Sequence, residues 1–227
     1  MLNRYEGFSM NYHHDYTPFE IGDAFRVVPP GTPAAGDGRL DLVIAKGAFG
    51  SGEHETTASC LELLRTLPLE GARVLDVGSG TAILAIAALK LGAASALCVD
   101  ISEQAIETGR RNCALNGVEE RARHFCGFLH DAPTESYDLI LANIYGDLLL
   151  DLSGEIFSRA APGGHLLFSG MLWEYNFDVR KRYEGLGCRV LINRMLPDFS
   201  TLVLRRAIDN DVPLVTQSAA LLAPTGT

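Results

Sequence analysis

Short apolar runs separated by polar and glycine-rich turns repeat along the middle of the chain. They predict a strand at 73–77, a helix at 83–91, a strand at 96–99 and a helix at 103–116. Only a few residues join each element to the next, which is typical of parallel strands with helices crossing over between them. The middle of the chain therefore predicts a doubly wound α/β sheet.

The segments on either side continue this pattern. The further predicted elements, in chain order, are strands 24–28 and 40–44, helix 56–67, strand 137–142, helix 148–160, strand 165–168 and a closing antiparallel hairpin of 189–192 with 201–204. Pro162-Gly163-Gly164 should end the helix that precedes it. From Ala207 onward polar and small residues predominate, and we expect a poorly ordered tail there.

Composition restricts the class of protein. A length of 227 residues suits one domain with a full core, and 47% hydrophobic with 21% charged residues is typical of a soluble globular chain. No apolar run approaches ~18 residues and the first residues lack a signal-peptide core, so we expect a cytoplasmic protein that does not enter a membrane. The 5 cysteines lack paired spacing and should be reduced thiols.

The formal net charge of −9 bears on the partner. Direct nucleic-acid binding depends on clustered Lys and Arg, and we do not expect it of a chain this acidic. The charge would suit a basic protein substrate. It fits equally well with an ordinary enzyme that its charge keeps soluble, so both interpretations stay open.

Two glycines, Gly78 and Gly80, lie directly between an apolar strand and a helix. Glycine is favoured at such a turn when the backbone has to pass close to a ligand. Asp100 ends the next predicted strand, 20 residues beyond Gly80, where a carboxylate can accept hydrogen bonds from the ribose hydroxyls of an adenosine. Ser102 offers itself as the cap of the following helix, so we predict that Asp100 binds a ligand.

NAD and S-adenosylmethionine both fit a glycine loop followed by an acid. A dinucleotide loop requires a small residue at position 83, where this chain has Ile83. Asp76 adds a negative charge that would repel phosphates and suit the cationic amino-acid end of S-adenosylmethionine, although it could instead bond loop amides. The loop therefore favours the sulfonium cofactor over a dehydrogenase. The histidines lack the spacing of a metal site, and we predict no metal.

Three longer stretches resemble the PrmA-type methyltransferases, which modify a large-subunit ribosomal protein: 47–57 (GAFGSGEHETT), 75–80 (LDVGSG) and 83–93 (ILAIAALKLGA). The similarity continues through Ala142-Asn143-Ile144 and Ser169-Gly170 and covers roughly residues 16–206. It implies a Rossmann-like, seven-stranded S-adenosylmethionine methyltransferase fold. Such a fold has a mostly parallel sheet with one reversed strand near its edge, consistent with a C-terminal antiparallel hairpin.

The resemblance also implies a pocket for S-adenosylmethionine. The residues that match the family's cofactor contacts are Thr57, Gly78, Asp100 and Asn143. Phe49 and Gly50 would lie over the same pocket, and Asp76 and Gly80 complete the predicted cofactor site. Ala82 departs from the pattern, because the family usually has a third glycine there.

The chain is predicted to have three parts. Residues 1–45 are an N-terminal extension with the first strands, 46–206 the methyltransferase catalytic domain, and 207–227 a disordered tail. Family members carry a separate N-terminal domain that captures the ribosomal protein, and the residues before Tyr16 cannot form one. Tyr145-Gly146-Asp147 replaces the small apolar residues that usually follow the Asn-Ile pair, so we expect a changed acceptor mouth.

Methyl transfer from a sulfonium needs no metal, because the leaving thioether is neutral and the protein chiefly positions donor and acceptor. We predict that Asn143 orients the acceptor or the cofactor, although it could be a turn residue. His54 could move a proton or merely cap the next helix. The resemblance implies N-methylation of a ribosomal protein, at a lysine or an amino-terminal amine. A small-molecule methyltransferase and a non-catalytic S-adenosylmethionine-binding relative remain alternatives.

Overall fold

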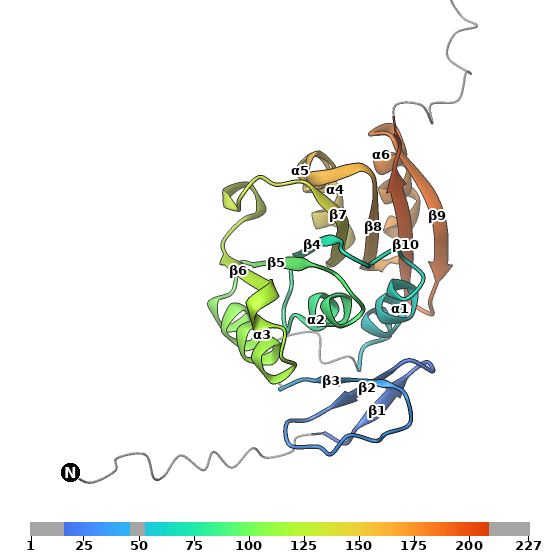
Figure 1. Cartoon of the computed structure of the whole chain (residues 1–227). Coiled ribbons are helices and arrows are strands. Elements are labelled where there is room, and N and C mark those ends of the chain that lie inside the picture. The colour runs from blue at the N-terminus through green and yellow to red at the C-terminus, as the bar shows by residue number, and fades with distance from the viewer. Residues whose placement is uncertain (1–15, 46–52, 209–227) are drawn as a thin grey trace, which may run out of the picture.

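The computed structural model describes residues 16–45 and 53–208 and shows a main sheet of seven strands with helices on both faces (Figure 1). The strands of this sheet are β4 (Arg73–Val77), β5 (Ser95–Asp100), β6 (Ala122–Cys126), β7 (Tyr137–Asn143), β8 (Ala160–Leu172), β9 (Cys188–Met195) and β10 (Phe199–Arg206). The helices are α1 (Glu55–Leu64), α2 (Ile83–Lys90), α3 (Glu103–Leu115), α4 (Gly146–Asp151), α5 (Ser153–Arg159) and α6 (Asn176–Gly185). Short 3-10 helices lie at Glu119–Arg121, Leu129–Asp131 and Trp173–Tyr175.

The strand order is β6-β5-β4-β7-β8-β10-β9. Neighbours from β6 to β8 pair in parallel, whereas β10 pairs antiparallel with both β8 and β9. The reversed strand next to the edge and the closing β9–β10 hairpin confirm the predicted Rossmann-like methyltransferase fold. From β4 the chain adds β5 and β6 on one side of the sheet and then crosses back to add β7 on the other side of β4. The strand order therefore reverses between β4 and β7, and α/β sheets bind ligands at such a switch point.

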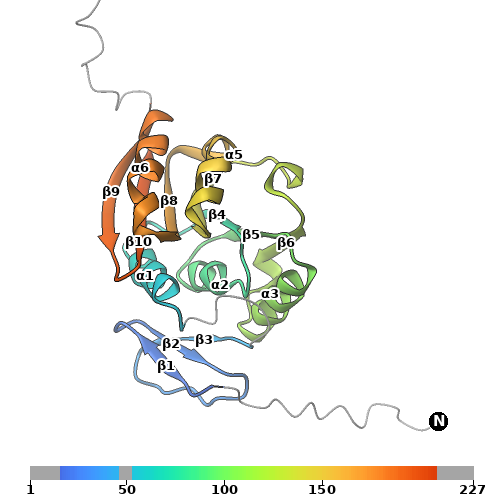
Figure 2. The same ribbon diagram turned by 180° about the vertical axis from the view of Figure 1, so that it is seen from behind.

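Successive residues of each strand point to opposite faces, and this alternation builds two apolar cores. In β7, Leu139 and Leu141 pack on the side of α1, α2 and α3, while Ile140 packs on the side of α4, α5 and α6. Figures 1 and 2 show the two groups of helices on opposite faces of the sheet. Every residue from Ile83 to Leu89 of α2 is buried, as expected of a helix that is apolar all round.

A small second sheet packs on the core that α1, α2 and α3 share. Its strands are β1 (Phe19–Ile21), β2 (Phe25–Val28) and β3 (Leu40–Val43), with β1–β2 antiparallel and β2–β3 parallel. Asn112 of α3 and Asn116, which caps the C-terminal end of this helix, extend the hydrogen bonding of β3. Asn116 exchanges bonds with both backbone groups of Val43, at 3.0 and 2.7 Å. Asn112 accepts from the Ala45 N–H at 2.8 Å and donates to the Thr81 carbonyl at 3.0 Å, which joins the small sheet to the glycine loop.

The structure corrects two of the predicted elements. The single helix at 148–160 is wrong, because α4 and α5 separate at Leu152, where Ser153 Oγ accepts a hydrogen bond from Arg182 Nε at 2.7 Å. The predicted break at Pro162-Gly163-Gly164 is also wrong. β8 begins at Ala160 and absorbs these residues through a register shift against β7 between Tyr137 and Leu139.

Three elements were not predicted from the sequence: β1, β6 and α6. The β6 strand lies at the sheet edge, and none of its residues is fully buried. The α6 helix buries only Asn176, Val179 and Tyr183. Neither segment therefore shows a strong apolar period. The predicted loop at 47–52 and the predicted tail beyond residue 208 lie outside the described residues.

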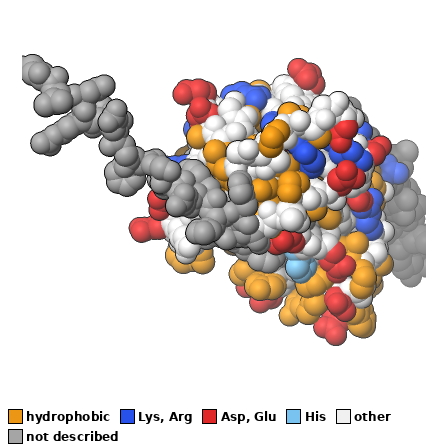
Figure 3. All heavy atoms as spheres, turned by 90° about the horizontal axis from the view of Figure 1, so that it is seen from below, with side chains coloured by type: hydrophobic (Ala, Val, Ile, Leu, Met, Phe, Trp, Pro, Cys, Tyr) orange, Lys and Arg blue, Asp and Glu red, His pale blue; other side chains and the backbone are white. Residues whose placement is uncertain are grey.

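The described surface carries charges of both signs. On the face that the small sheet occupies, basic and acidic side chains are interspersed among apolar ones (Figure 3). Within residues 16–45 and 53–208, no helix has the length and apolar character needed to cross a bilayer.

Candidate cofactor and acceptor site

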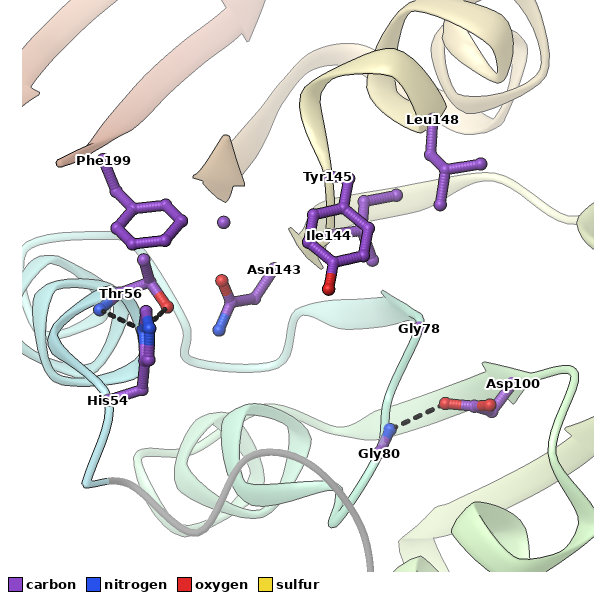
Figure 4. Close-up of a pocket in the computed structure, with 11 residues that line it drawn as sticks. His54, Thr56, Gly78, Gly80, Asp100, Asn143, Ile144, Tyr145, Leu148 and Phe199 are labelled. Atoms are coloured by element: carbon purple, nitrogen blue, oxygen red, sulfur yellow. Dashed lines mark hydrogen bonds between the residues drawn. The ribbon is translucent and has the colours of Figure 1, made fainter. Parts of the chain in front are cut away.

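A cavity of ≈ 390 Å³ opens at the carboxyl ends of β4, β5 and β7 (Figure 4). It lies at the switch point of the sheet, where an α/β fold is expected to bind its ligand. Among the described residues, the lining consists of His54, Thr56, Gly78, Gly80, Asp100, Asn143, Ile144, Tyr145, Leu148, Gly170 and Phe199. Four predicted site residues therefore line one cavity together with His54.

The glycine loop after β4 adopts a conformation that favours glycine. Gly78 and Gly80 have left-handed φ values of 70° and 52°. A Cβ atom on Gly78 would lie 2.5 Å from Cγ2 of Ile144. The loop is held against β5, because the N–H groups of Gly78 and Ser79 both donate to the Val99 carbonyl, at 2.8 and 3.1 Å. Backbone therefore forms one wall of the cavity, as predicted.

Asp100 ends β5 at the edge of the cavity. Its Oδ2 accepts from the Gly80 N–H at 2.9 Å and its Oδ1 from the Ser102 N–H at 3.0 Å. Ser102 caps α3 by accepting from the Ala105 N–H, as predicted. The Asp100 carboxylate is therefore fixed in place, and each oxygen keeps a lone pair for a further donor.

Asn143 ends β7 beside the glycine loop. Its Nδ2 donates to Thr57 Oγ1 at 3.2 Å. Its Oδ1 is buried and has no hydrogen-bond partner among the described residues. Gly170 leaves room for this side chain, since a Cβ there would lie 2.9 Å from Asn143 Oδ1. The site thus contains one oriented acceptor oxygen that the described residues leave unsatisfied.

Thr57 and His54 lie on α1 and at its start. Thr57 is fully buried and contacts the site through Asn143, whereas Thr56 contributes directly to the cavity lining. His54 caps α1, with its Nδ1 accepting from the Thr56 N–H at 3.3 Å. Its ring also packs edge-on against Phe199, with centroids 5.0 Å apart. The structure thus confirms that His54 caps this helix, and a role in proton transfer stays a prediction.

Asp76 lies beneath the loop and only 2% of it is exposed. Burial raises the pKa of its carboxyl to about 7, and a hydrogen bond from the Ala85 backbone N–H opposes this rise. It is absent from the described lining of the cavity. This position favours the alternative in which Asp76 bonds backbone amides near the loop.

Several residues of the cavity wall were not predicted from the sequence. Phe199 comes from β10, far along the chain, and no local signal marks it. Tyr145 was identified only as a departure from the family pattern, Ile144 only as part of the Ala142-Asn143-Ile144 match, and Leu148 only as the start of a predicted helix. The predicted residues Phe49 and Gly50 lie outside the described residues.

Comparison with known families decides the relationship. A family model described as "Ribosomal protein L11 methyltransferase (PrmA)" matches residues 6–202. The chain belongs to this PrmA family. A relative named ribosomal protein L11 methyltransferase, from Azotobacter vinelandii, is 40% identical over 172 residues, 75% of this chain. One of the same name from Geotalea uraniireducens is 35% identical over 214 residues, which cover 88% of this chain and 68% of that protein.

Among PrmA relatives of known structure, the crystal structure of a ribosomal protein L11 methylase from Lactobacillus delbrueckii subsp. bulgaricus is 27% identical. It superposes with a TM-score of 0.76 and covers 85% of this chain and 98% of its own. A Pyrococcus furiosus methyltransferase, 22% identical with a TM-score of 0.58, covers 66% of this chain and 82% of its own and supports the fold alone. The chain spans 59% of the length of the Azotobacter relative.

Proposed function

We propose that this chain transfers a methyl group from S-adenosylmethionine to an amine of a protein, and that the protein is ribosomal protein L11. The observation that carries the proposal is the unpaired Oδ1 of Asn143, buried in the cavity that Asp100 and the glycine loop also line. A buried acceptor without a donor costs ~1–3 kcal/mol. An N–H of a bound acceptor amine would satisfy it.

The chain's residues fit the adenosine part of the cofactor. Asp100 has acceptor capacity left on both oxygens, which suits two ribose hydroxyls. Ile101 and Phe128 are 70% and 61% exposed, and they follow the ends of the adjacent strands β5 and β6. A hydrogen bond of 2.9 Å from the Gly127 N–H to the Asp100 carbonyl joins these strand ends. Two exposed apolar side chains would thus flank a flat purine.

The cofactor supplies a methyl group on a sulfonium, and the protein has to present a neutral amine. A free lysine amine has a pKa near ~10.4. The wall that Ile144, Leu148 and Phe199 form is apolar, and desolvation there favours loss of the proton. Asn143 Oδ1 would accept a remaining N–H and so orient the nitrogen lone pair.

Calorimetric titration tests the cofactor assignment. We expect S-adenosylmethionine and S-adenosylhomocysteine to bind and NAD not to bind. Asp100→Asn should weaken binding about 10-fold or more, because one acceptor of the ribose is lost, at ~1.5–3 kcal/mol for a bond to a charged group. Asp151→Asn, on the exposed side of α4, is the matched control. Binding of NAD instead, or an equal loss in both variants, contradicts the assignment.

Transfer of labelled methyl groups to ribosomal protein L11 tests the acceptor assignment. We expect Asn143→Ala to lower kcat about 10²-fold, as for removal of one positioned polar group in other enzymes. Its affinity for S-adenosylmethionine should change little. Cofactor binding without any transfer to L11 by the wild-type chain would favour another acceptor or a non-catalytic role.

A further inference from the structure

Two aromatic rings stand at the mouth of the cavity. Tyr145, directly before α4, and Phe199, at the start of β10, both belong to the lining, and Tyr145 is 72% exposed. Figure 4 shows the two rings on opposite sides of the opening, with the amide of Asn143 between them. A group that reaches Asn143 Oδ1 from outside therefore passes between two ring faces or edges.

Close packing holds both residues in place. A Cβ atom on Gly146 would lie 2.5 Å from Cβ and Cγ of Tyr175, so the first residue of α4 is pressed against this ring. Tyr145 precedes it with extended backbone, at φ −61° and ψ 152°. Phe199 packs edge-on against His54, with ring planes at 77°. Packing thus fixes the backbone that carries Tyr145 and the ring of Phe199.

Negative charge is sparse along the described lining of the cavity. Among the described lining residues, Asp100 is the one carboxylate, and the Gly80 and Ser102 N–H groups fix it at the glycine loop. A carboxylate beside an ammonium raises the pKa of the amine and would oppose its deprotonation. An aromatic face attracts a cation by ~0.5–2 kcal/mol and leaves no strong acceptor that retains the proton.

We propose that Tyr145 and Phe199 are the acceptor-recognition residues of this site, and that the group they take is an alkylammonium. The proposal rests on the methyl-transfer function proposed above. Asn143 supplies the acceptor for the N–H, and the rings supply the attraction for the charge.

Two probes of the same shape, one cationic and one uncharged, show whether the site recognises the charge of its ligand or only the shape. N-acetyl-trimethyllysine amide and its uncharged tert-butyl isostere have nearly the same shape, and NMR titration in the presence of S-adenosylhomocysteine gives both affinities. We expect the cationic probe to bind ~2–30-fold more tightly, as cation–π attraction predicts. Tyr145→Leu should abolish most of this preference, and Tyr145→Phe should keep it. Equal binding of the two probes, or an unchanged preference in Tyr145→Leu, overturns the proposal.

Kinetics provides the second readout. Tyr145→Leu should raise KM for the protein acceptor several-fold while kcat and the affinity for S-adenosylmethionine change less than about twofold. Phe177→Leu is the matched control, because Phe177 is 58% exposed and lies outside the described lining. A Tyr145→Leu variant with unchanged KM contradicts the inference. If the wild-type chain transfers no methyl group at all, the proposed function fails, while the probe titration still tests the aromatic mouth.

Discussion

His54 is both a helix cap and a residue of the cavity wall. Asparagine is a good N-cap but cannot take a proton at neutral pH, so it separates the two roles. We expect His54→Ala to lower the free energy of unfolding by ~1 kcal/mol and His54→Asn to keep it within ~0.5 kcal/mol, as measured in urea. Equal destabilisation by both changes would show that the helix cap is not how His54 stabilises the fold. Lost transfer and an altered pH–rate profile in a stable His54→Asn variant would establish proton transfer.

Asp76 predicts a pH dependence of stability. Burial raises the pKa of its carboxyl in the fold to about 7, compared with ~3.9 in an unfolded chain. Its contribution to stability is therefore complete below the unfolded pKa and is lost as pH rises toward 7. We expect the unfolding free energy of wild type minus that of Asp76→Asn to fall between pH 4 and 7. A difference independent of pH would show that Asp76 is ionised throughout.

The quantity to measure is the difference in unfolding free energy between wild type and Asp76→Asn, because His124 changes the stability with pH in the opposite direction. Burial and nearby Arg110 lower the pKa of His124 to about 4. Its contribution is present above the unfolded pKa of ~6.5 and is lost as pH falls through 4. This contribution is the same in wild type and Asp76→Asn, and it cancels in the comparison.

At the scale of elements, the site depends on how the ends of β7 and β8 meet. Gly170 has φ 78°, and a Cβ there would lie 2.8 Å from the Ile144 carbonyl and 2.9 Å from Asn143 Oδ1. We expect Gly170→Ala to displace Asn143, lower methyl transfer about 10²-fold and cost ~1–3 kcal/mol of stability. Gly154→Ala in α5 is the control, because nothing lies within 4 Å of its added Cβ. Full transfer activity in Gly170→Ala would contradict the role given to Asn143.

The elements that the sequence predicted well are those with apolar runs imposed by burial on both faces. Strands β4, β5 and β7 and helix α2 are of this kind. The break between α4 and α5 could not be predicted, because the contact of Ser153 with Arg182 joins residues 29 positions apart. Likewise, β8 continues through Pro162-Gly163-Gly164 only because β7 provides a shifted register.

The residues of the site also fall into those that the sequence predicts and those that it does not. Gly78, Gly80, Asp100 and Asn143 could be predicted, because each lies at or just after the end of a strand that the sequence displays. Phe199 reaches the cavity through the pairing of β10 with β8, where it lies opposite Leu172. The pattern of the sequence predicts a hairpin there but not which residue of it faces the cavity.

At the scale of the whole molecule, Asn112 joins the small sheet to the main body. It is fully buried and bonds both the Ala45 N–H and the Thr81 carbonyl. We expect Asn112→Ala to lower the free energy of unfolding by ~2–3 kcal/mol, because two buried backbone groups lose their partner. Arg111→Ala, exposed on the same helix, should stay within ~0.5 kcal/mol. Equal unfolding midpoints for both variants would show that the amide contributes nothing.

Strand β10 lies between β8 and β9 although it follows both in the chain, and it brings Phe199 to the cavity. The cofactor side comes from β4 and β5, which end at Val77 and Asp100 and are therefore made well before Phe199. The cavity therefore lacks part of the wall that would receive the acceptor until the last strand of the described sheet has been made.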